Sequence, residues 1–414
     1  MSAKRPGIRD QPRAVWAVLA ASIVAFMGIG LVDPILPIIA KGLHADNSQV
    51  ELLFTSYFAI IGVSNLLAGF ASSRVGPKRT ILWGLVLVVV CSALAGASNT
   101  VPEVVGFRAG WGLGIALFVS TSMSVIVGAT VGGLSTAVML FESALGVGIA
   151  SGPLVGGLLG GVSWRLPFFG VAALMAISFT CVLTLVAPTP PPPREQRIAF
   201  LAPLKALRHK GLFTASVLAL LYNFGFFTLL AYTPLPLHLG VHQLGIVFFG
   251  WGVMLAIGAV FLAPALGRRV PRLKLLGVVL ALITLDLLAI AIGIHSHVAM
   301  ITAIVLSGVV LGVGNATLSN LLLGVSRADI AVGTSAINFV RFLGGAVAPF
   351  LAGKLSESVS AAAPLYVGAG GVAAALVLLV AARSLLVEGA TPAPVVLPAP
   401  VVPEPEPEPQ LVAA

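Results

Sequence analysis

The chain alternates between long apolar runs and short polar segments along most of its length. Twelve of the runs are long enough to be transmembrane helices, since a span needs about 20 apolar residues. Most runs are apolar on every side rather than on one face, as is typical of helices in lipid. The pattern therefore predicts an all-α membrane protein, with spans near residues 14–40, 49–71, 80–98, 102–127, 135–160, 166–187, 212–235, 243–266, 273–294, 298–322, 331–353 and 362–386.

Composition supports a membrane environment and excludes several partners. The chain is 58% hydrophobic and only 9% charged, whereas soluble domains carry about 25% charged residues. The net charge of +9 comes from short basic clusters between the apolar runs, so we expect a lipid bilayer rather than nucleic acid as partner. Cys91 and Cys181 both lie in apolar runs, which predicts no disulfide framework, metal site or cofactor.

The basic residues also predict an orientation. If the N-terminus is cytoplasmic, loops on that side hold 18 of the 23 lysines and arginines, and the opposite loops hold three. Cytoplasmic loops are usually the ones rich in Lys and Arg. We therefore expect a multi-pass protein of the cell membrane with both termini in the cytoplasm, and a first apolar run that is retained rather than cleaved.

A proline-rich and then basic segment at 188–211 divides the chain. It predicts a cytoplasmic linker, with a surface helix at 200–209, between six-helix bundles at 1–187 and 212–388. The halves repeat weakly, since Gly-x-Gly motifs begin at Gly112 in the fourth span and Gly312 in the tenth. The Pro- and Glu-rich tail at 389–414 is expected to be disordered.

Two glycine-containing motifs stand out. The loop between the second and third spans combines turn-forming glycines with cations that anchor the cytoplasmic side. The fifth span repeats glycine every four residues, so the glycines share a face that allows close helix packing, and its proline permits a kink. We expect this face to suit two bundles that rock against each other. The residues concerned are Gly69, Arg74, Gly76, Lys78 and Arg79 in the loop, and Gly148, Gly152, Pro153, Gly156 and Gly157 in the span.

These motifs resemble those of the major facilitator superfamily, in its twelve-helix drug:proton antiporter branch. The fifth span fits the antiporter signature Gly-x-x-x-Gly-Pro-x-x-Gly-Gly at every fixed position, and Arg108 precedes Gly-x-Gly as in that family. The loop departs from Gly-x-x-x-Asp-Arg-x-Gly-Arg-Arg/Lys, because Ser73 replaces the acid and Pro77 an arginine. The resemblance implies two pseudo-symmetric six-helix bundles and proton-coupled export, with a weakened latch at this loop.

A few charges lie inside predicted spans, where charge is costly and indicates function. Asp33 and Arg108 each lie about 12 Å from the outer end of their spans, and the resemblance makes these spans neighbours. Our hypothesis is that Asp33 carries the proton, that Arg108 gates it, and that Glu142 is a second proton or cation site. A polar helix end at Asp33 and a structural ion pair at Arg108 are the alternatives, while Asp286 is expected to have a structural partner.

Aromatic and amide residues in spans two, seven and eleven are candidates for the substrate cavity, because aromatic faces suit flat lipophilic cations. Core packing or contact with lipid is an equal alternative for each of them. The candidates are Tyr57, Asn65, Tyr222, Asn223, Phe226, Phe227, Asn338 and Arg341.

The leading functional hypothesis is a monomeric, proton-coupled exporter of lipophilic, drug-like compounds. Export of a specific metabolite, such as a sugar or siderophore, is the alternative within transporters. An intramembrane enzyme is disfavoured, since the chain has no His-Glu-x-x-His. The chain also has no phosphate-binding loop, so we do not expect ATP to be its energy source. The internal repeat and the glycine face argue against a receptor or channel.

Overall fold

The computed structural model describes residues 11–131, 133–188, 190–191, 193, 197–325 and 330–389. Within these residues, 12 helices are long and apolar enough to cross a membrane. They match the predicted spans to within a few residues, which confirms the all-α membrane fold. The predicted disordered tail lies outside the described residues, apart from Gly389.

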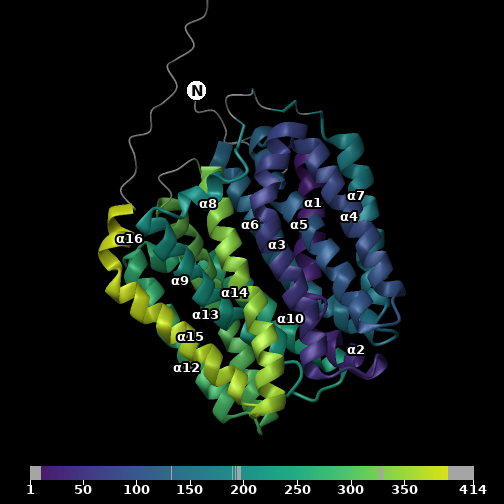
Figure 1. Cartoon of the computed structure of the whole chain (residues 1–414), viewed down its shortest axis with the longest axis vertical. Helices are drawn as coiled ribbons and strands as arrows, with labels where there is room; N and C mark the ends of the chain where they lie inside the picture. The colour runs from purple at the N-terminus through teal and green to yellow at the C-terminus, as the bar shows by residue number, and fades with distance from the viewer. Residues whose placement is uncertain are drawn as a thin grey trace, which may run out of the picture.

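Figure 1 shows the two groups of helices side by side, purple to teal for the first half of the chain and teal to yellow for the second. The first group begins with a span broken at Pro34, where a short turn, η2, separates α1 from α2. The elements of this N-terminal bundle are α1 (Arg13–Gly30), η2 (Asp33–Ile35), α2 (Leu36–Gly42), α3 (Asn47–Val75), α4 (Pro77–Ala97), α5 (Val101–Ala129), α6 (Gly133–Gly160) and α7 (Leu166–Leu185).

The second group follows a short linker helix, α8, which is shorter than the helix expected at 200–209. Two of its spans contain a π-helical turn, η4 and η5. The elements are α8 (Ala202–Ala206), α9 (Lys210–Phe227), η4 (Thr228–Tyr232), α10 (Val241–Ile257), η5 (Gly258–Leu262), α11 (Ala263–Gly267), α12 (Arg272–Ile292), α13 (His297–Val325), α14 (Ile330–Ser358), α15 (Ala363–Ala381) and α16 (Arg383–Gly389).

The spans alternate in direction, which defines two sides of the molecule. We call the side on which α1 begins and α8 lies the proximal side, and the side that carries α2 the distal side (Figure 1). That the proximal side faces the cytoplasm stays a prediction.

The internal repeat is visible in how glycines pack. A β-carbon added at Gly112 of α5 would lie 2.6 Å from a carbonyl oxygen of α3, and one at Gly114 would lie 2.6 Å from a carbonyl oxygen of α4. In the second half, Gly312 of α13 faces a carbonyl oxygen of α10 in the same way, and Gly314 faces a side chain of α12. Equivalent glycines therefore join equivalent helices, as expected for two pseudo-symmetric bundles.

Two helix pairs join the bundles, α3 with α14 and α6 with α10. On the distal side both pairs are in close contact. A β-carbon at Gly353 of α14 would lie 2.6 Å from the Cα of Ser48 of α3, and one at Gly157 of α6 would lie 2.8 Å from the Cα of Gly245 of α10. The Ser48 amide also donates a hydrogen bond of 2.7 Å to the Glu357 carboxylate of α14. The distal side is thus closed between the bundles.

Candidate transport site

The glycine face of α6 lies against α1. A β-carbon at Gly148 or Gly152 would lie within 2.6 Å of a carbonyl oxygen of α1, and one at Gly156 would press on the Leu31 carbonyl. The sequence predicted the shared face correctly, but the expected position between the two bundles is wrong for these three residues. Of the motif, Gly157 is the glycine that meets α10 of the other bundle.

Close packing of α6 on α1 fixes the position of η2, which carries Asp33. Pro34 packs on Gly156, and Pro153 packs on Gly30. Since η2 also packs against α10 of the other bundle, Asp33 lies where α1, α6 and α10 come together. Any movement of α10 over α6 therefore acts on the segment that holds this carboxyl group.

Asp33 and Arg108 form the first charged cluster. Both side chains are fully buried, and they attract each other electrostatically. Neither carboxylate oxygen of Asp33 has a hydrogen-bond partner among the described residues, nor do Nε and Nη2 of Arg108. Nη1 of Arg108 donates a long hydrogen bond, 3.4 Å, to the Gly28 carbonyl. The two side chains are therefore near enough to interact electrostatically but make no hydrogen bond to each other, and their coupling role stays a prediction.

Aromatic rings hold the Arg108 guanidinium in place of a carboxylate. Its central carbon lies 4.1 Å from the centre of the Tyr57 ring and 4.6 Å from that of Trp111. Cation–π attraction of this kind gains strength away from water. Tyr57 was predicted to line the substrate cavity, whereas the structure places it, fully buried, beneath Arg108.

Glu51 is a buried charge that we did not predict to be functional. It lies in the second turn of α3, is fully buried, and neither of its carboxylate oxygens has a partner within the described part of the chain. It interacts electrostatically with Asp33. The only signal of Glu51 in the sequence is its position just inside the predicted second span, and an acid at a span end is usually taken for a residue at the membrane surface.

Glu142 and Arg341 form a second charged cluster, in the proximal halves of α6 and α14. Glu142 of α6 and Arg341 of α14 attract each other across the two bundles. Arg341 donates a hydrogen bond from Nε to the Asn223 side-chain oxygen at 3.1 Å, and one from Nη2 to the side-chain oxygen of Asn315. Asn223 was predicted, whereas Asn315 was not, because the candidates came from spans two, seven and eleven and Asn315 lies in the tenth.

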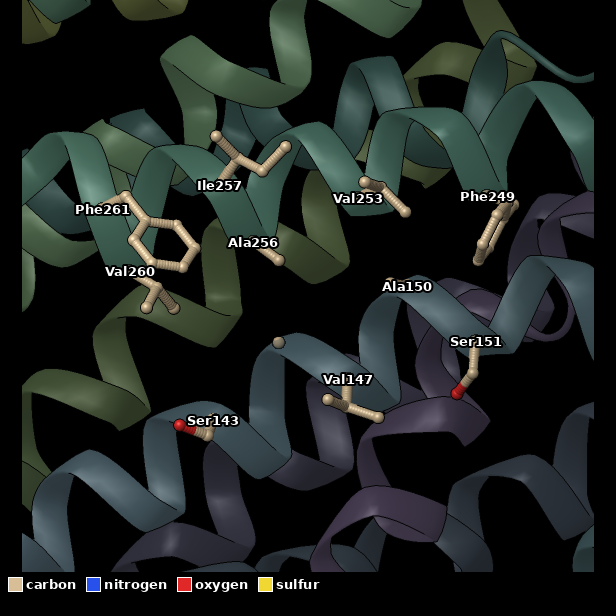
Figure 2. Close-up of a pocket in the computed structure, with 11 residues that line it drawn as sticks. Ser143, Val147, Ala150, Ser151, Phe249, Val253, Ala256, Ile257, Val260 and Phe261 are labelled. Carbon is tan, nitrogen blue, oxygen red and sulfur yellow. The ribbon is translucent and has the colours of Figure 1, made fainter.

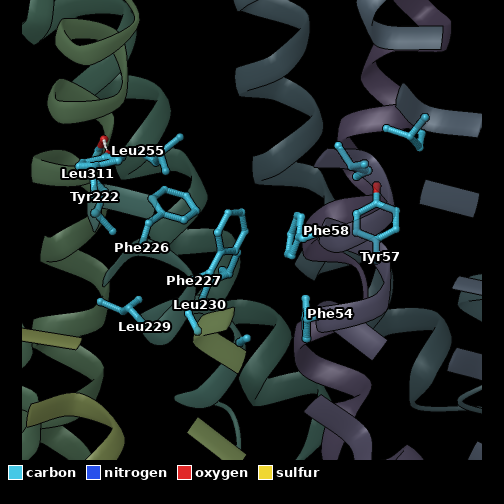
Figure 3. Packing of buried hydrophobic residues seen from close by; sticks show 14 of the residues in the cluster. Phe54, Tyr57, Phe58, Tyr222, Phe226, Phe227, Leu229, Leu230, Leu255 and Leu311 are labelled. Carbon is cyan, nitrogen blue, oxygen red and sulfur yellow. Dashed lines mark hydrogen bonds between the residues drawn. The ribbon is translucent and has the colours of Figure 1, made fainter. Parts of the chain in front are cut away.

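Aromatic side chains meet between the bundles (Figure 3). Phe58 of α3 points toward Phe227 of α9, with ring centres 4.0 Å apart, and Phe226 contacts Trp251 at 5.7 Å. Of the predicted cavity residues, Phe227 thus lies at the bundle interface, while Phe226 is 9% exposed and packs mainly on its own bundle.

Two further cavity candidates make hydrogen bonds within one bundle. The Tyr222 hydroxyl donates to the Leu311 carbonyl at 2.7 Å, and Asn65 accepts a hydrogen bond from Ser120 at 2.8 Å. Both are buried, and their place in a substrate cavity stays a prediction. Asn338 is half-buried on α14. Asp286 of α12, expected to have a structural partner, has a buried Oδ2 without one among the residues described.

An apolar crevice separates α6 and α10 in their proximal halves (Figure 2). Its volume is about 440 Å³. Val147 and Ser143 on α6 and Ala256 on α10 belong to its walls, which are almost wholly apolar. The two helices that touch at Gly157 and Gly245 on the distal side therefore leave an opening on the proximal side.

The proximal loop between α3 and α4 turns at Gly76, whose φ of 95° favours glycine. Lys78 donates to the Leu183 carbonyl at 2.8 Å, and Arg74 lies over the Phe70 ring at 4.1 Å. Ser73, in the place of the usual acid, donates to the Phe70 carbonyl of its own helix at 2.9 Å. This hydrogen bond lies within α3 and does not link the two bundles.

Comparison with known proteins agrees with this architecture. The sequence profile of the Major Facilitator Superfamily matches residues 18–349. The chain belongs to this superfamily. It is therefore a membrane transporter rather than an enzyme, and the resemblance noted in its motifs is confirmed.

Relatives within the superfamily include drug exporters. The chain is 46% identical to the multidrug efflux protein YfmO of Bacillus subtilis over 365 residues. This alignment covers 88% of this chain and 92% of the relative. It is 25% identical to the quinolone resistance protein NorA of Staphylococcus aureus, over 65% of this chain and 71% of the relative. A D-xylose–proton symporter shares the fold, with a TM-score of 0.70 at 16% identity over 88% of this chain and 96% of the symporter.

Proposed function

We propose that this chain is a proton-coupled antiporter that exports lipophilic, cationic, drug-like compounds across the cell membrane by alternating access. The observation that carries the proposal is the fully buried Asp33 carboxyl group, which has no hydrogen-bond partner among the described residues and lies within the attraction of Arg108. The relationship to a multidrug efflux protein supports the class of substrate.

The proton site works through the balance between two forms of Asp33. As a neutral acid, the side chain needs no counter-charge in its apolar surroundings. As a carboxylate, it attracts Arg108, which is held by the Tyr57 and Trp111 rings rather than by a direct ion pair. Since η2 packs on both α6 and α10, a change of charge at Asp33 alters the electrostatics of the interface between the bundles.

The substrate enters on the proximal side, which we assign to the cytoplasm from its basic loops. The apolar crevice between α6 and α10 suits a lipophilic compound. Glu142, which is exposed beside this crevice, attracts a cation, and a bound cation competes with Arg341 for it. Entry of the substrate thus weakens the electrostatic attraction between Glu142 and Arg341 of the other bundle.

The test uses inverted membrane vesicles with an imposed pH gradient, acid inside, and a panel of cationic, neutral and sugar-like compounds. Uptake of lipophilic cations that depends on the gradient supports the proposal. Uptake that is unchanged when the gradient is collapsed overturns the antiport mechanism, and uptake of the sugar-like compounds alone overturns the substrate class.

A further inference from the structure

Glu51 is a buried ionisable group in the distal part of α3 that the proposed mechanism leaves unused. It interacts electrostatically with Asp33 of η2 and Tyr232 of η4, and Glu357 of α14 lies against Ser48, three residues before it on α3.

The surroundings of Glu51 do not fit a purely structural acid. Buried polar groups in proteins are nearly always hydrogen-bonded, and an isolated buried carboxylate is costly. Both oxygens of Glu51 are buried and lack a partner in the described ranges. By contrast, the Glu357 carboxylate of α14 accepts a hydrogen bond of 2.7 Å from the Ser48 amide of α3 and so joins these two helices. Glu51 contributes no such bond.

Glu51 interacts electrostatically with ionisable groups of both bundles. On one side it acts on Asp33 of the N-terminal bundle, and on the other it acts on Tyr232 of the C-terminal bundle. Tyr232 lies in η4, which packs against α3, and its hydroxyl donates to the Ala361 carbonyl at 2.7 Å within the C-terminal bundle. Electrostatic interactions thus link Tyr232 to Glu51, Glu51 to Asp33, and Asp33 to Arg108.

We infer that Glu51 is the distal proton relay of this transporter, which takes up a proton from the outer side and hands it to Asp33. This inference rests on the proposed function. In the transfer, the O–H bond at the Glu51 carboxylic acid breaks and one forms at the Asp33 carboxylate, so the total charge of the pair is unchanged. Separation of α3 from α14 and η4 on the distal side admits the next proton to Glu51.

The test separates proton coupling from substrate translocation. Purified wild type, Glu51→Gln and Glu103→Gln are placed in proteoliposomes, and two rates are measured with a lipophilic cation. One is uptake driven by a pH gradient, and the other is exchange of labelled for unlabelled substrate without a gradient. Glu103→Gln is the matched control, since Glu103 is an exposed acid on the same side that caps α5 through the Asn99 amide at 2.9 Å, and glutamine preserves such a cap.

The inference predicts that Glu51→Gln loses gradient-driven uptake and keeps exchange, while Glu103→Gln keeps both. Gradient-driven uptake by Glu51→Gln at the wild-type rate overturns it. Loss of both rates also overturns it, because Glu51 then serves substrate binding or the closure itself. If the wild type shows no gradient-driven uptake, the proposed function fails and the inference fails with it.

Should Glu51→Gln not accumulate as folded protein, Glu51→Asp replaces it. The shorter acid keeps an ionisable group but withdraws it from Asp33. It is expected to slow gradient-driven uptake while exchange stays at the wild-type rate. Equal slowing of both rates, or of neither, contradicts a relay at this position.

Discussion

The guanidinium of Arg108 lies over the Tyr57 ring, 4.1 Å from its centre, although Asp33 is close enough to attract it. The Tyr57 hydroxyl has no hydrogen-bond partner among the residues described, so Tyr57 interacts with Arg108 through the face of its ring. The contact depends on backbone packing, because Gly112 lets α5 approach the Tyr57 carbonyl on α3. Arg108 is therefore stabilised in a position from which it can still respond to the charge of Asp33.

Replacing Tyr57 tests this relationship. Tyr57→Phe keeps the ring and should transport at the wild-type rate, whereas Tyr57→Leu removes a desolvated cation–π contact worth about 2 kcal/mol. We expect gradient-driven uptake per folded molecule to fall in Tyr57→Leu alone, measured in proteoliposomes. Equal rates in the two variants would show that the ring does not hold Arg108.

The glycine face of α6 gives a prediction about stability. In Gly148→Ala the new β-carbon would lie 2.6 Å from the Ile23 carbonyl of α1, and overpacking of this kind costs about 1–3 kcal/mol. Gly106→Ala on α5 is the control, because nothing lies within 4 Å of its β-carbon. Thermal unfolding in detergent should show a lower midpoint for Gly148→Ala only, and equal midpoints would contradict the packing of α6 on α1.

Glu142 gives a prediction about selectivity. Glu142→Gln keeps the shape of the side chain but removes its charge, so cationic substrates should bind about tenfold more weakly, a loss of about 1.4 kcal/mol. Neutral substrates should be affected little. Fluorescence quenching can measure how tightly the purified wild type and variant bind one cationic and one neutral compound, and the comparison checks this selective loss. A similar loss for both compounds would remove Glu142 from the cation site.

The sequence predicted the spans well because a span depends on local hydrophobicity. The fifth span, expected at 135–160, is found as α6 at Gly133–Gly160. The repeat of Gly148 and its neighbours likewise predicted a shared face, since four-residue spacing alone fixes it. Which helix covers that face is a property of the whole fold, and α1 rather than the other bundle covers it.

The candidate site was predicted only in part, for the same reason. Asp33 and Arg108 were recognised because charge deep inside an apolar run is conspicuous. Glu51 was missed because it lies near a span end, and its burial comes from elements distant in sequence such as η4 and α14. The approach of Tyr57 to Arg108 likewise follows from tertiary packing and leaves no pattern in the sequence.

The central claim is that Asp33 carries the coupled proton, and Asp33→Asn tests it most directly. Asparagine fits the same space and removes the ionisable group, and among the described residues Asp33 has no hydrogen-bonded partner that the change would leave unpaired. The decisive measurement is uptake of a lipophilic cation into proteoliposomes with and without a pH gradient, for wild type and variant. We predict that Asp33→Asn remains folded and exchanges substrate, but accumulates none above equilibrium when the gradient is imposed. Gradient-driven accumulation by Asp33→Asn at the wild-type level would contradict the account.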